Sequence, residues 1–299
     1  MEKIEATSLA KINFALEVKE LRSDGYHELA TLFQTISLGD RLVFRPDREG
    51  KVSLVGDMEE IAWDESNLIY RAALALKETA GVKQGVAIEV KKIIPPGRGL
   101  GGGSSNAAVT LMVLNRLWGL NWPARQLIRL GSSLGADVAF FFYGGLCSGV
   151  GRGEKLAPLP NLLSGWFVIV IPDFALSTRQ VFQQFDALPL SLTSRDKESK
   201  IIQFLKKQDR SLFRQFTNDL ELAAFEIYPQ LADIKQEMAR SGAGLSMMTG
   251  SGSAIYGFFD DQPQAKKAAE RMKARYNYKV VLAETVGRER YEEMLRTGA

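Results

Sequence analysis

The most informative stretch of this chain is Pro95-Pro96-Gly97-Arg98-Gly99-Leu100-Gly101-Gly102-Gly103-Ser104-Ser105-Asn106, which contains five glycines, two serines and no acidic residue. Glycine permits positive φ and lets a polyanion approach backbone N–H groups without meeting a Cβ. A helical pattern follows directly, and a helix N-terminus offers unpaired N–H groups and a partial positive charge. We expect Ser105 or Asn106 to cap this helix. The segment therefore predicts a cradle for phosphate.

Three better-known phosphate-binding signatures fit this segment poorly. Gly97-x-Gly99-x-x-Gly102 matches the dinucleotide fingerprint in form, but two prolines separate it from the preceding strand, and no Asp or Glu follows about 20 residues on. A triphosphate P-loop ends in Gly-Lys-Ser/Thr, and the segment contains no lysine. A protein-kinase loop is accompanied by an HRD segment, whereas the only histidine of this chain is His27. A flexible surface loop without a ligand is the plain structural alternative.

The pattern around the loop predicts an α+β protein in two halves. Apolar, extended stretches predict strands over residues 12–18, 26–36, 41–44, 51–54, 85–90, 167–171, 250–259 and 279–283. Helical periodicity predicts helices over residues 67–81, 107–118, 125–134 and 264–276 and within 196–240. We expect residues 51–54 to pair with residues 41–44, and residues 151–160 to form a connector. The predicted domains are therefore 1–155 and 156–299.

Composition excludes several partners. The net charge is +3 and there is no dense cluster of Lys and Arg, which argues against nucleic acid and anionic membranes. The longest strongly apolar run, residues 166–171, is far shorter than the ~20 residues of a membrane helix. The N-terminal segment carries charges where a signal peptide has its apolar core. We therefore expect a cytoplasmic protein that is not bound to a membrane.

The chain has one cysteine and one histidine, which limits the metal sites it could form. Cys147 is the only cysteine and His27 the only histidine, so an intramolecular disulfide and a Cys-rich or His-rich metal cluster are excluded. Cys147 is expected to be a buried small hydrophobe. We predict no metal site built from protein residues alone. A metal that takes part would have oxygen ligands, which favours Mg²⁺ arriving with phosphates.

Several segments together resemble the GHMP kinases. Residues 95–105 fill the phosphate loop of these enzymes, approximately Pro-x-x-x-Gly-Leu-Gly-Ser/Gly-Ser-Ser. Further blocks occur in the order and spacing of the family: Ala10-Lys11-Ile12-Asn13, Asp24-Gly25-Tyr26-His27-Glu28-Leu29, Leu134-Gly135-Ala136-Asp137-Val138 and Thr249-Gly250-Ser251-Gly252-Ser253. The chain departs from the usual family pattern at Arg98, where glycine is common, and at Asn106, Ala139 and residues 172–177.

This resemblance implies both fold and reaction. The expected fold is an N-terminal nucleotide-binding domain of the ribosomal-S5-domain-2-like type and a GHMP C-terminal domain, with the active site between them. The block Asp24 to Leu29 is similar to the members that act on a cytidyl substrate. For these, the implied reaction is phosphorylation by ATP, with Mg²⁺, of the 2-hydroxyl of a diphosphocytidyl methylerythritol, on the non-mevalonate route to isoprenoid precursors. We expect a monomer or a weak homodimer.

The resemblance also assigns site residues. The residues expected to bind ATP are Pro95, Pro96, Gly97, Arg98, Gly99, Leu100, Gly101, Gly102, Gly103, Ser104 and Ser105, with Asn67 and Lys92 on the adenosine side. Asn67 could equally be only the N-cap of its helix. The residues expected to bind the cytidyl substrate are Asn13, Tyr26, His27 and Phe182, because an aromatic ring stacks on a base and an imidazole can hydrogen-bond to its edge.

Asp137 and Lys11 are the expected catalytic pair. By resemblance Asp137 accepts the proton of the attacking hydroxyl and Lys11 lies beside it. A neighbouring lysine would keep the carboxylate ionised and polarise the attacking oxygen. The plain alternatives are a helix cap near Gly135 for Asp137 and an edge-strand charge for Lys11.

Two other functions stay open at this point. The chain could be another GHMP kinase, acting on homoserine, mevalonate or a sugar, although those relatives lack the block Asp24 to Leu29. It could also be a nucleotide-binding regulator of the same fold that has lost catalysis. Such a protein would lack the proton acceptor or have a broken loop, whereas this chain retains Lys11 and Asp137.

Overall fold

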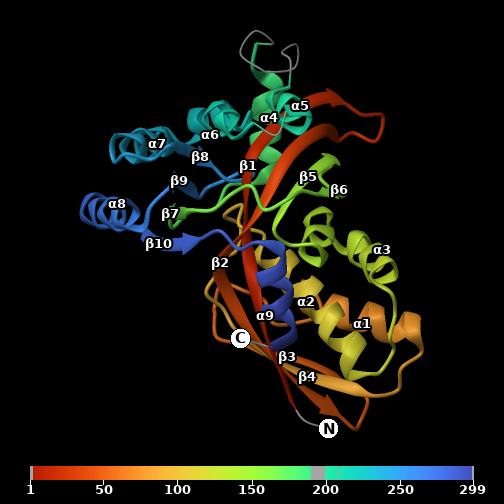
Figure 1. Ribbon diagram of the computed structural model, residues 1–299. Helices are drawn as coiled ribbons and strands as arrows, with labels where there is room; N and C mark the ends of the chain where they lie inside the picture. Colours follow the sequence, from red (N-terminus) through yellow and green to blue (C-terminus); the bar gives the residue numbers. More distant parts are fainter. Residues whose placement is uncertain (1–2, 190–198, 208, 298–299) are drawn as a thin grey trace.

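The computed structural model describes residues 3–189, 199–207 and 209–297, and Figure 1 shows their arrangement. The strands are β1 (Ile4–Leu21), β2 (His27–Asp47), β3 (Val52–Gly56), β4 (Gly85–Lys91), β5 (Leu146–Gly151), β6 (Lys155–Pro158), β7 (Trp166–Ile171), β8 (Leu245–Met248), β9 (Ile255–Phe259) and β10 (Lys279–Glu284). The α-helices are α1 (Leu68–Ala80), α2 (Gly102–Leu117), α3 (Ala124–Leu134), α4 (Thr178–Ala187), α5 (Lys200–Lys207), α6 (Glu221–Ile227), α7 (Gln230–Arg240), α8 (Gln262–Arg275) and α9 (Arg288–Thr297). The 3-10 helices are η1 (Ala136–Phe142) and η3 (Arg210–Gln215).

The first sheet is built around the long hairpin of β1 and β2. Its order is β3-β4-β2-β5-β6, with β1 on the other side of β2, and only the β3–β4 pair is parallel. The first half of β2 pairs with β5 and the second half pairs with β4. Strand β2 therefore connects the β5–β6 part of the sheet to the β3–β4 part. Helices α1 to α3 cover one face, and their apolar side chains form a core with those of β2 and β4.

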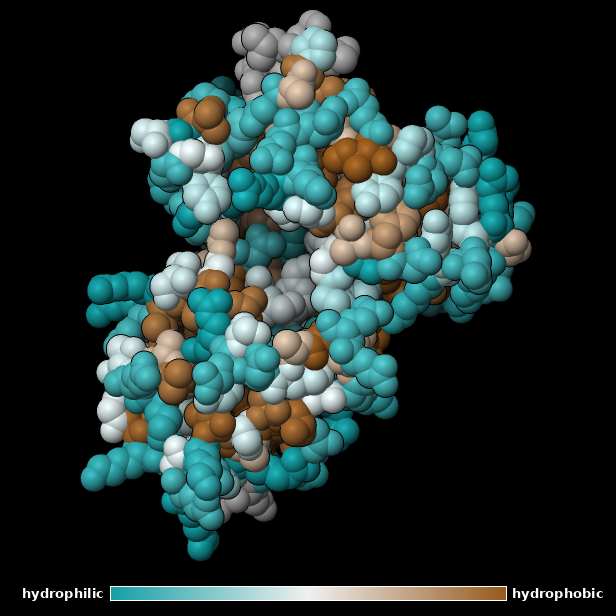
Figure 2. Space-filling model, turned by 180° about the vertical axis from the view of Figure 1, so that it is seen from behind, coloured by the Kyte–Doolittle hydropathy of each residue, from teal (hydrophilic) through white to brown (hydrophobic). Residues whose placement is uncertain are grey.

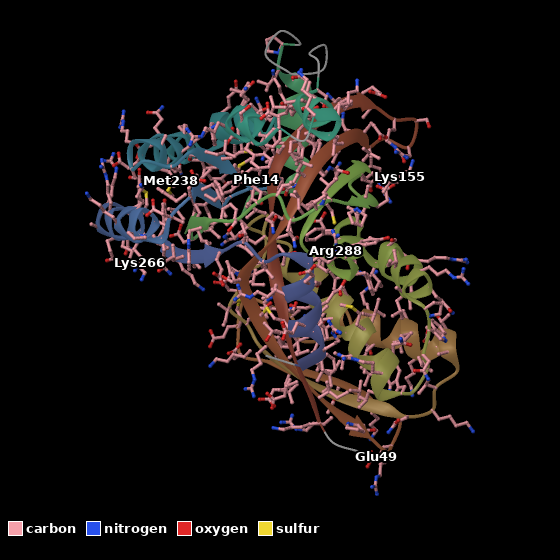
Figure 3. The ribbon with its side chains drawn as sticks, viewed as in Figure 1. Phe14, Glu49, Lys155, Met238, Lys266 and Arg288 are labelled. Carbon is pink, nitrogen blue, oxygen red and sulfur yellow. The ribbon has the colours of Figure 1, made fainter. Side chains whose placement is uncertain are left out.

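Strand β1 contributes to different cores along its length, with Ala6 in the cluster under α1 to α3 and Leu16 and Val18 in the cluster that contains α4. Ile12 and Phe14 are fully buried in the cluster that also contains Phe167 and Tyr256 of the second sheet. The ring of Phe14 contacts Phe167 edge-on and stacks on Tyr256. Phe14 therefore lies where β1 crosses the second sheet (Figure 3). Lys11 and Asn13 take the opposite face, and a register shift against β2 flanks each side of this pair.

The second sheet has the antiparallel order β10-β7-β9-β8. Its outer face packs on α4, α6, α7 and α8 through a cluster with Val168, Val170, Met238 and Met272 at its centre. The chain then returns to the first sheet, where α9 lies along β1 (Figure 1). Here the hydroxyl of Tyr291 donates to the carbonyl of Phe141 in η1 at 2.5 Å. The two halves are thus joined by β1 and by α9.

Most of the predicted elements are confirmed. The hairpin turn at residues 22–25, the helix beginning at Asn67 and ending at Gly81, and the strands at 85–90, 167–171 and 279–283 all occur. The helices predicted at 125–134 and 264–276 are α3 and α8, and α5 to α7 lie within 196–240, of which residues 196–198 and 208 are outside the described residues. Glycine 250 begins a turn that leads into β9.

Three predictions were wrong. Residues 41–44 are not a separate strand but continue β2, and β3 pairs with β4 instead of with them. Residues 151–160 are not a plain connector, because Lys155–Pro158 pairs with β5 as a hairpin. The division of the chain at residue 155 stays a prediction. Among the described residues, no helix is long and apolar enough to cross a membrane.

Candidate active site

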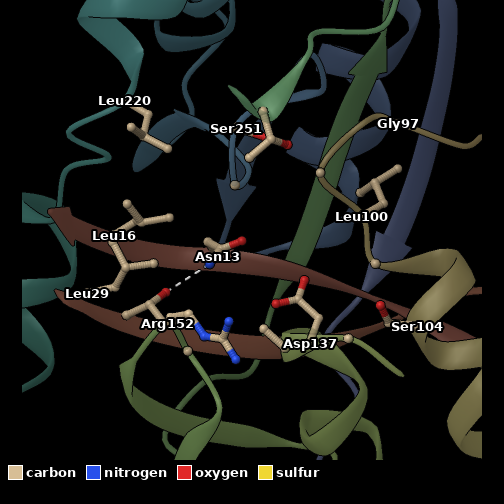
Figure 4. Close-up of a pocket in the computed structure, with 18 of the residues that line it drawn as sticks. Asn13, Leu16, Leu29, Gly97, Leu100, Ser104, Asp137, Arg152, Leu220 and Ser251 are labelled. Atoms are coloured by element: carbon tan, nitrogen blue, oxygen red, sulfur yellow. Dashed lines mark hydrogen bonds between the residues drawn. The ribbon is translucent and has the colours of Figure 1, made fainter. Parts of the chain in front are cut away.

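A cavity of about 1050 Å³ lies between the two halves of the molecule, and Figure 2 shows its mouth as a hollow between the upper and lower parts. Its walls include β1, the start of β2, the glycine loop, the end of α3 with η1, the turn after β5 that carries Arg152, and α4. The turn at residues 250–252 closes the side next to the glycine loop. The close-up in Figure 4 shows Asn13, Asp137 and Arg152 on one side and Gly97 and Ser251 on the other.

The glycine loop has its carbonyl groups anchored and its N–H groups free. The carbonyl of Leu100 accepts from the N–H of Lys11 and that of Gly99 from the hydroxyl of Thr249, both at 3.0 Å. In this fully described stretch no N–H group from Gly97 to Ser104 donates to a protein acceptor. Buried N–H groups rarely stay unpaired unless water or a ligand takes them. The loop therefore offers a row of donors to an anion.

Glycine is required in this loop for two physical reasons. Gly97, Gly99 and Gly101 have φ of 67°, 75° and 70°, a conformation that other residues rarely adopt. The backbone also passes close to its neighbours. A Cβ on Gly99 would lie 2.0 Å from the carbonyl oxygen of Thr249, and one on Gly101 would lie 2.9 Å from Lys11 Cγ. The loop thus packs tightly against β1 and the second half.

Helix α2 begins earlier than expected. Its first residue is Gly102 and its N-cap is Gly101, so the prediction that Ser105 or Asn106 caps the helix was wrong. The three N–H groups of its first turn, at residues 102–104, extend the free row of the loop. Ser104 lines the cavity, whereas Ser105 is fully buried and its hydroxyl accepts from Ser8 at 2.6 Å.

Three residues that we predicted to bind ATP do not line the cavity: Asn67, Lys92 and Ser105. Asn67 caps α1, accepting from the N–H of Ile69. The ammonium of Lys92 is buried and contacts Asp40 and Asn106, and Asp40 in turn accepts from the N–H groups of residues 93 and 94. This buried pair packs next to the end of the glycine loop, where a Cβ on Gly102 would lie 3.3 Å from Lys92 Nζ.

Lys11 and Asp137 do meet at the cavity wall. Their side chains form an ion pair of 3.2 Å, in which Lys11 is 4% exposed and Asp137 34% exposed. Lys11 also donates to the amide oxygen of Asn13 at 2.6 Å and lies over the ring of Phe33. Asp137 is in the first turn of η1, which packs its apolar side chains into the first core. A buried cation thus faces a carboxylate that solvent or a ligand can reach.

Asn13 is fixed from three directions. Its amide nitrogen donates to the hydroxyl of Thr31 at 2.8 Å, the dashed contact in Figure 4. Its backbone N–H donates to the hydroxyl of Thr249 at 3.0 Å, and its side-chain oxygen accepts from Lys11. Because all these groups are paired within the protein, Asn13 orients Lys11 in addition to lining the cavity.

The far end of the cavity is aromatic. Tyr26 is exposed at the rim, with the guanidinium of Arg152 4.9 Å from its ring centre. His27 is buried and stacks on Phe182 of α4 at 5.5 Å. Its Nδ1 donates to the carbonyl of Lys19, since a carbonyl can only accept, and its Nε2 lies 3.0 Å from the carboxylate of Asp186. A flat ring could be held here between aromatic faces.

Sequence reasoning missed several residues of the cavity. Arg152 falls in the stretch predicted to be a connector, but it directly follows β5 and lines the cavity. Helix α4 was not predicted, so Thr178, Arg179 and Asp186 of the cavity wall were missed with it. The capping serine, Ser177, was the available signal for this helix. Thr249 was quoted only as part of a glycine motif, and its two contacts across the chain depend on the fold.

The described residues contain no group of three or more His, Cys, Asp or Glu side chains that could hold a metal ion. Next to the glycine loop, the oxygen donors on the cavity wall include the carboxylate of Asp137 and the hydroxyl of Ser104. Two such donors suit a Mg²⁺ ion that takes most of its ligands from phosphates and water. The donor set therefore fits a metal that enters with a polyphosphate.

Comparison with known proteins agrees with this geometry. The family of GHMP kinases N terminal domains matches residues 67–145, and that of GHMP kinases C terminal domains matches residues 201–277. A homoserine kinase from Cytophaga hutchinsonii has the same fold, with a TM-score of 0.75 at 21% identity over 96% of this chain and 95% of its own. The fold and site define a small-molecule kinase of the GHMP class, with its N-terminal and C-terminal domains.

The sequence comparisons identify the family within this class. The 4-diphosphocytidyl-2-C-methyl-D-erythritol kinase of Solibacter usitatus is 40% identical, over 97% of this chain and 90% of its own. That of Thermodesulfovibrio yellowstonii is 38% identical, over 87% and 91%. A crystal structure of a 4-(cytidine 5'-diphospho)-2C-methyl-D-erythritol kinase has a TM-score of 0.78 at 34% identity, covering 95% of this chain and 100% of its own. The chain belongs to the 4-diphosphocytidyl-2-C-methyl-D-erythritol kinase family.

Proposed function

We propose that this protein transfers the γ-phosphoryl group of ATP to the 2-hydroxyl of 4-diphosphocytidyl-2-C-methyl-D-erythritol. The observation that carries the proposal is the Lys11–Asp137 pair, which shares one cavity with the free N–H row of the glycine loop. Proton acceptor and phosphate cradle are the two parts that phosphoryl transfer to an alcohol requires. The names of the relatives supply the substrate.

The catalytic end works by positioning and charge. The substrate hydroxyl donates to the carboxylate of Asp137 and loses its proton to it as the oxygen attacks the γ-phosphorus. Lys11, held by Asn13, orients the carboxylate through their ion pair and stabilises negative charge that develops on the attacking oxygen. The N–H row of residues 97–104 and the N-terminus of α2 bind the phosphate oxygens. Mg²⁺, held by Asp137, Ser104 and the phosphates, would offset the remaining charge.

The opposite end of the cavity selects the substrate. Tyr26, Phe182 and His27 offer ring faces for a cytosine, and Arg152 offers a guanidinium for its oxygen or for the diphosphate. The length of the cavity between Tyr26 and Asp137 would then be spanned by the ribose and diphosphate. A cytoplasmic location, a monomeric or weakly dimeric state and the absence of nucleic-acid binding stay predictions.

The proposal is tested by measuring ADP release from ATP with the cytidyl substrate, and separately with homoserine and mevalonate. We expect turnover with the cytidyl substrate alone, Mg²⁺-dependent, and competitive inhibition by CDP. Turnover with homoserine or mevalonate would assign the chain to another reaction of the class. Binding of ATP without turnover of any of the three would favour a nucleotide-binding regulator.

A further inference from the structure

Arg98 and Leu100 are the two non-glycine residues between Gly97 and Gly101 in the glycine loop. It stands between Gly97 and Gly99, which have positive φ, whereas Arg98 itself does not. A side chain is therefore tolerated at 98 without backbone strain. Arg98 is 8% exposed and lines the cavity. The motif alone predicts that Arg98 binds ATP, whereas the contacts of its guanidinium show that it bonds to the backbone around the loop.

The guanidinium of Arg98 joins two backbone segments through three carbonyl groups. Its Nη1 donates to the carbonyl of Pro96 in the loop at 3.0 Å. Its Nε and Nη2 donate to the carbonyls of Pro172 and Asp173, at 2.9 and 2.8 Å. Pro172 directly follows β7 of the second sheet. The planar, forked donor set of arginine suits such a bridge, which a lysine with its single nitrogen cannot reproduce.

Further contacts run alongside this bridge. The carbonyl of Arg98 accepts from the N–H of Ala254 at 3.3 Å, and the hydroxyl of Ser253 donates to the carbonyl of Phe174 at 2.6 Å. The loop, the segment after β7 and the turn before β9 are therefore bonded to one another. Of these contacts, only those of the guanidinium reach from the loop to the segment after β7, so the loop is tied to that segment by one side chain.

The charge of Arg98 has no close counter-ion. Among the described residues, no carboxylate lies within ion-pair distance of its guanidinium, and all three partners are neutral carbonyls. Burial lowers the pKa of Arg98, with weaker opposing effects of Glu60 and Asp173, but a guanidinium stays protonated at any physiological pH. A positive charge thus remains beside the free N–H row, in surroundings where solvent screens it less than at the surface.

We propose that Arg98 is a positioning residue for the nucleotide: it holds the glycine loop against the second half so that the N–H row converges on the ATP phosphates, and its uncompensated charge favours them. This inference rests on the proposed binding of ATP phosphates to the loop. It does not depend on the identity of the phosphate acceptor, so it can be tested by nucleotide binding alone.

The experiment compares Arg98→Gly, Arg98→Met and Arg98→Lys with the wild type. Glycine is the residue common in the family at this position, methionine keeps an unbranched apolar stem without charge, and lysine keeps the charge without the fork. The matched control is Arg125→Met, which removes an exposed arginine at the start of α3. Calorimetry with Mg²⁺ and a non-hydrolysable ATP analogue gives Kd, and steady-state kinetics give KM for each substrate and kcat.

We expect Arg98→Gly and Arg98→Met to weaken analogue binding and to raise KM for ATP by about tenfold. A change of this size corresponds to the loss of about one charge-assisted hydrogen bond between the loop and the phosphates. KM for the cytidyl substrate should change less than about twofold, and Arg98→Lys should recover only part of the loss, since charge alone is kept. The control should match the wild type.

Two results would overturn the inference. One is unchanged analogue affinity in Arg98→Gly. The other is an equal rise of both KM values with a lowered Tm, which would mark a general loss of stability. A wild-type protein that binds the analogue but does not phosphorylate the cytidyl substrate would instead refute the proposed reaction. The effect of Arg98 on nucleotide affinity could still be measured by calorimetry.

Discussion

At the scale of single residues, the active centre depends on a few polar side chains whose partners come from distant segments. Lys11 and Asn13 are neighbours in the sequence, but Asp137, Thr31 and Thr249 reach them only through the fold. The ammonium of Lys11 is buried and has the carboxylate of Asp137 and the amide oxygen of Asn13 as partners. Removing one member of a buried ion pair can cost stability, so Tm is measured together with kcat for each variant of this pair.

Asp137→Asn tests the proton acceptor. We expect kcat to fall by about 10² or more, because the amide cannot take the hydroxyl proton. KM for ATP should rise only about twofold to threefold, because the N–H row and Ser104 still hold the phosphates and Mg²⁺. The control is Asp260→Asn, which alters an exposed carboxylate after β9. Steady-state kinetics of both variants with the cytidyl substrate give the comparison. Near-wild-type turnover of Asp137→Asn would assign the proton to water or to the γ-phosphate.

At the scale of elements, the β1–β2 turn is held by charges that also place Tyr26 and His27. Glu28 accepts from the N–H of Gly151 at 2.7 Å and from Arg22 at 2.9 Å. The backbone hydrogen bond of Gly151, with help from Arg22, lowers the pKa of Glu28 below its ordinary value of 4.5. The carboxylate therefore links the tip of the hairpin to the end of β5, which carries Arg152.

Glu28→Gln should make stability less dependent on pH in acid. Because the folded-state pKa of Glu28 is lowered, its contribution is complete above the unfolded-state value and disappears as pH falls through the folded-state value. We expect a Tm deficit of about 2 °C at neutral pH, the scale of a partly exposed pair, that narrows as pH falls below the ordinary value of 4.5. Thermal unfolding from neutral pH into this acid range measures it.

The control for this prediction is Glu89→Gln, which removes an exposed carboxylate paired with Arg45 on the same sheet. Its Tm at neutral pH should lie closer to that of the wild type than the Tm of Glu28→Gln does, because an exposed ion pair contributes little to stability. A deficit of Glu28→Gln that stays constant down to the lowest pH would show that the charge of Glu28 does not stabilise the turn.

At the scale of the whole molecule, α9 returns from the second half and supports the segment that carries Asp137. Tyr291 is buried, and its hydroxyl donates to the carbonyl of Phe141. The ring tip of Phe141 lies against the glycine loop, only 2.9 Å from where a Cβ on Gly101 would be. Arg288, labelled in Figure 3 at the start of α9, donates to the carbonyls of Gly144 and Leu146. The catalytic wall is therefore backed by the last helix of the chain.

Tyr291→Phe tests this support. Loss of the hydroxyl leaves a buried carbonyl unpaired, which should cost about 1 kcal/mol of stability and lower kcat by about threefold to tenfold as η1 loosens. Tyr276→Phe is a matched control, because its hydroxyl bonds to Asp233 on the far side of the second sheet. It should lose similar stability with kcat unchanged. If both variants have the same kcat, measured well below Tm, then α9 does not help to position Asp137.

Local patterns of the sequence were sufficient for much of this structure. The glycine loop, the hairpin turn and the caps of α1 were predictable, because turn conformation and capping depend on residues within one or two turns. Helices α4 and α9 were missed, since both are short and polar and owe their place to packing. The partner of β3 was wrong for a related reason, because strand pairing joins segments more than 30 residues apart.

The sequence by itself determined that this chain has a phosphate cradle, a set of motifs in the order typical of GHMP kinases, and a cytidyl-type block at Asp24 to Leu29. Only the tertiary structure decided which motif residues reach the cavity. It placed Lys92 and Ser105 beneath the loop and brought Arg98 to the carbonyls after β7. Conformational preferences act over a few residues, whereas the orientation of a side chain toward a cavity depends on everything packed around it.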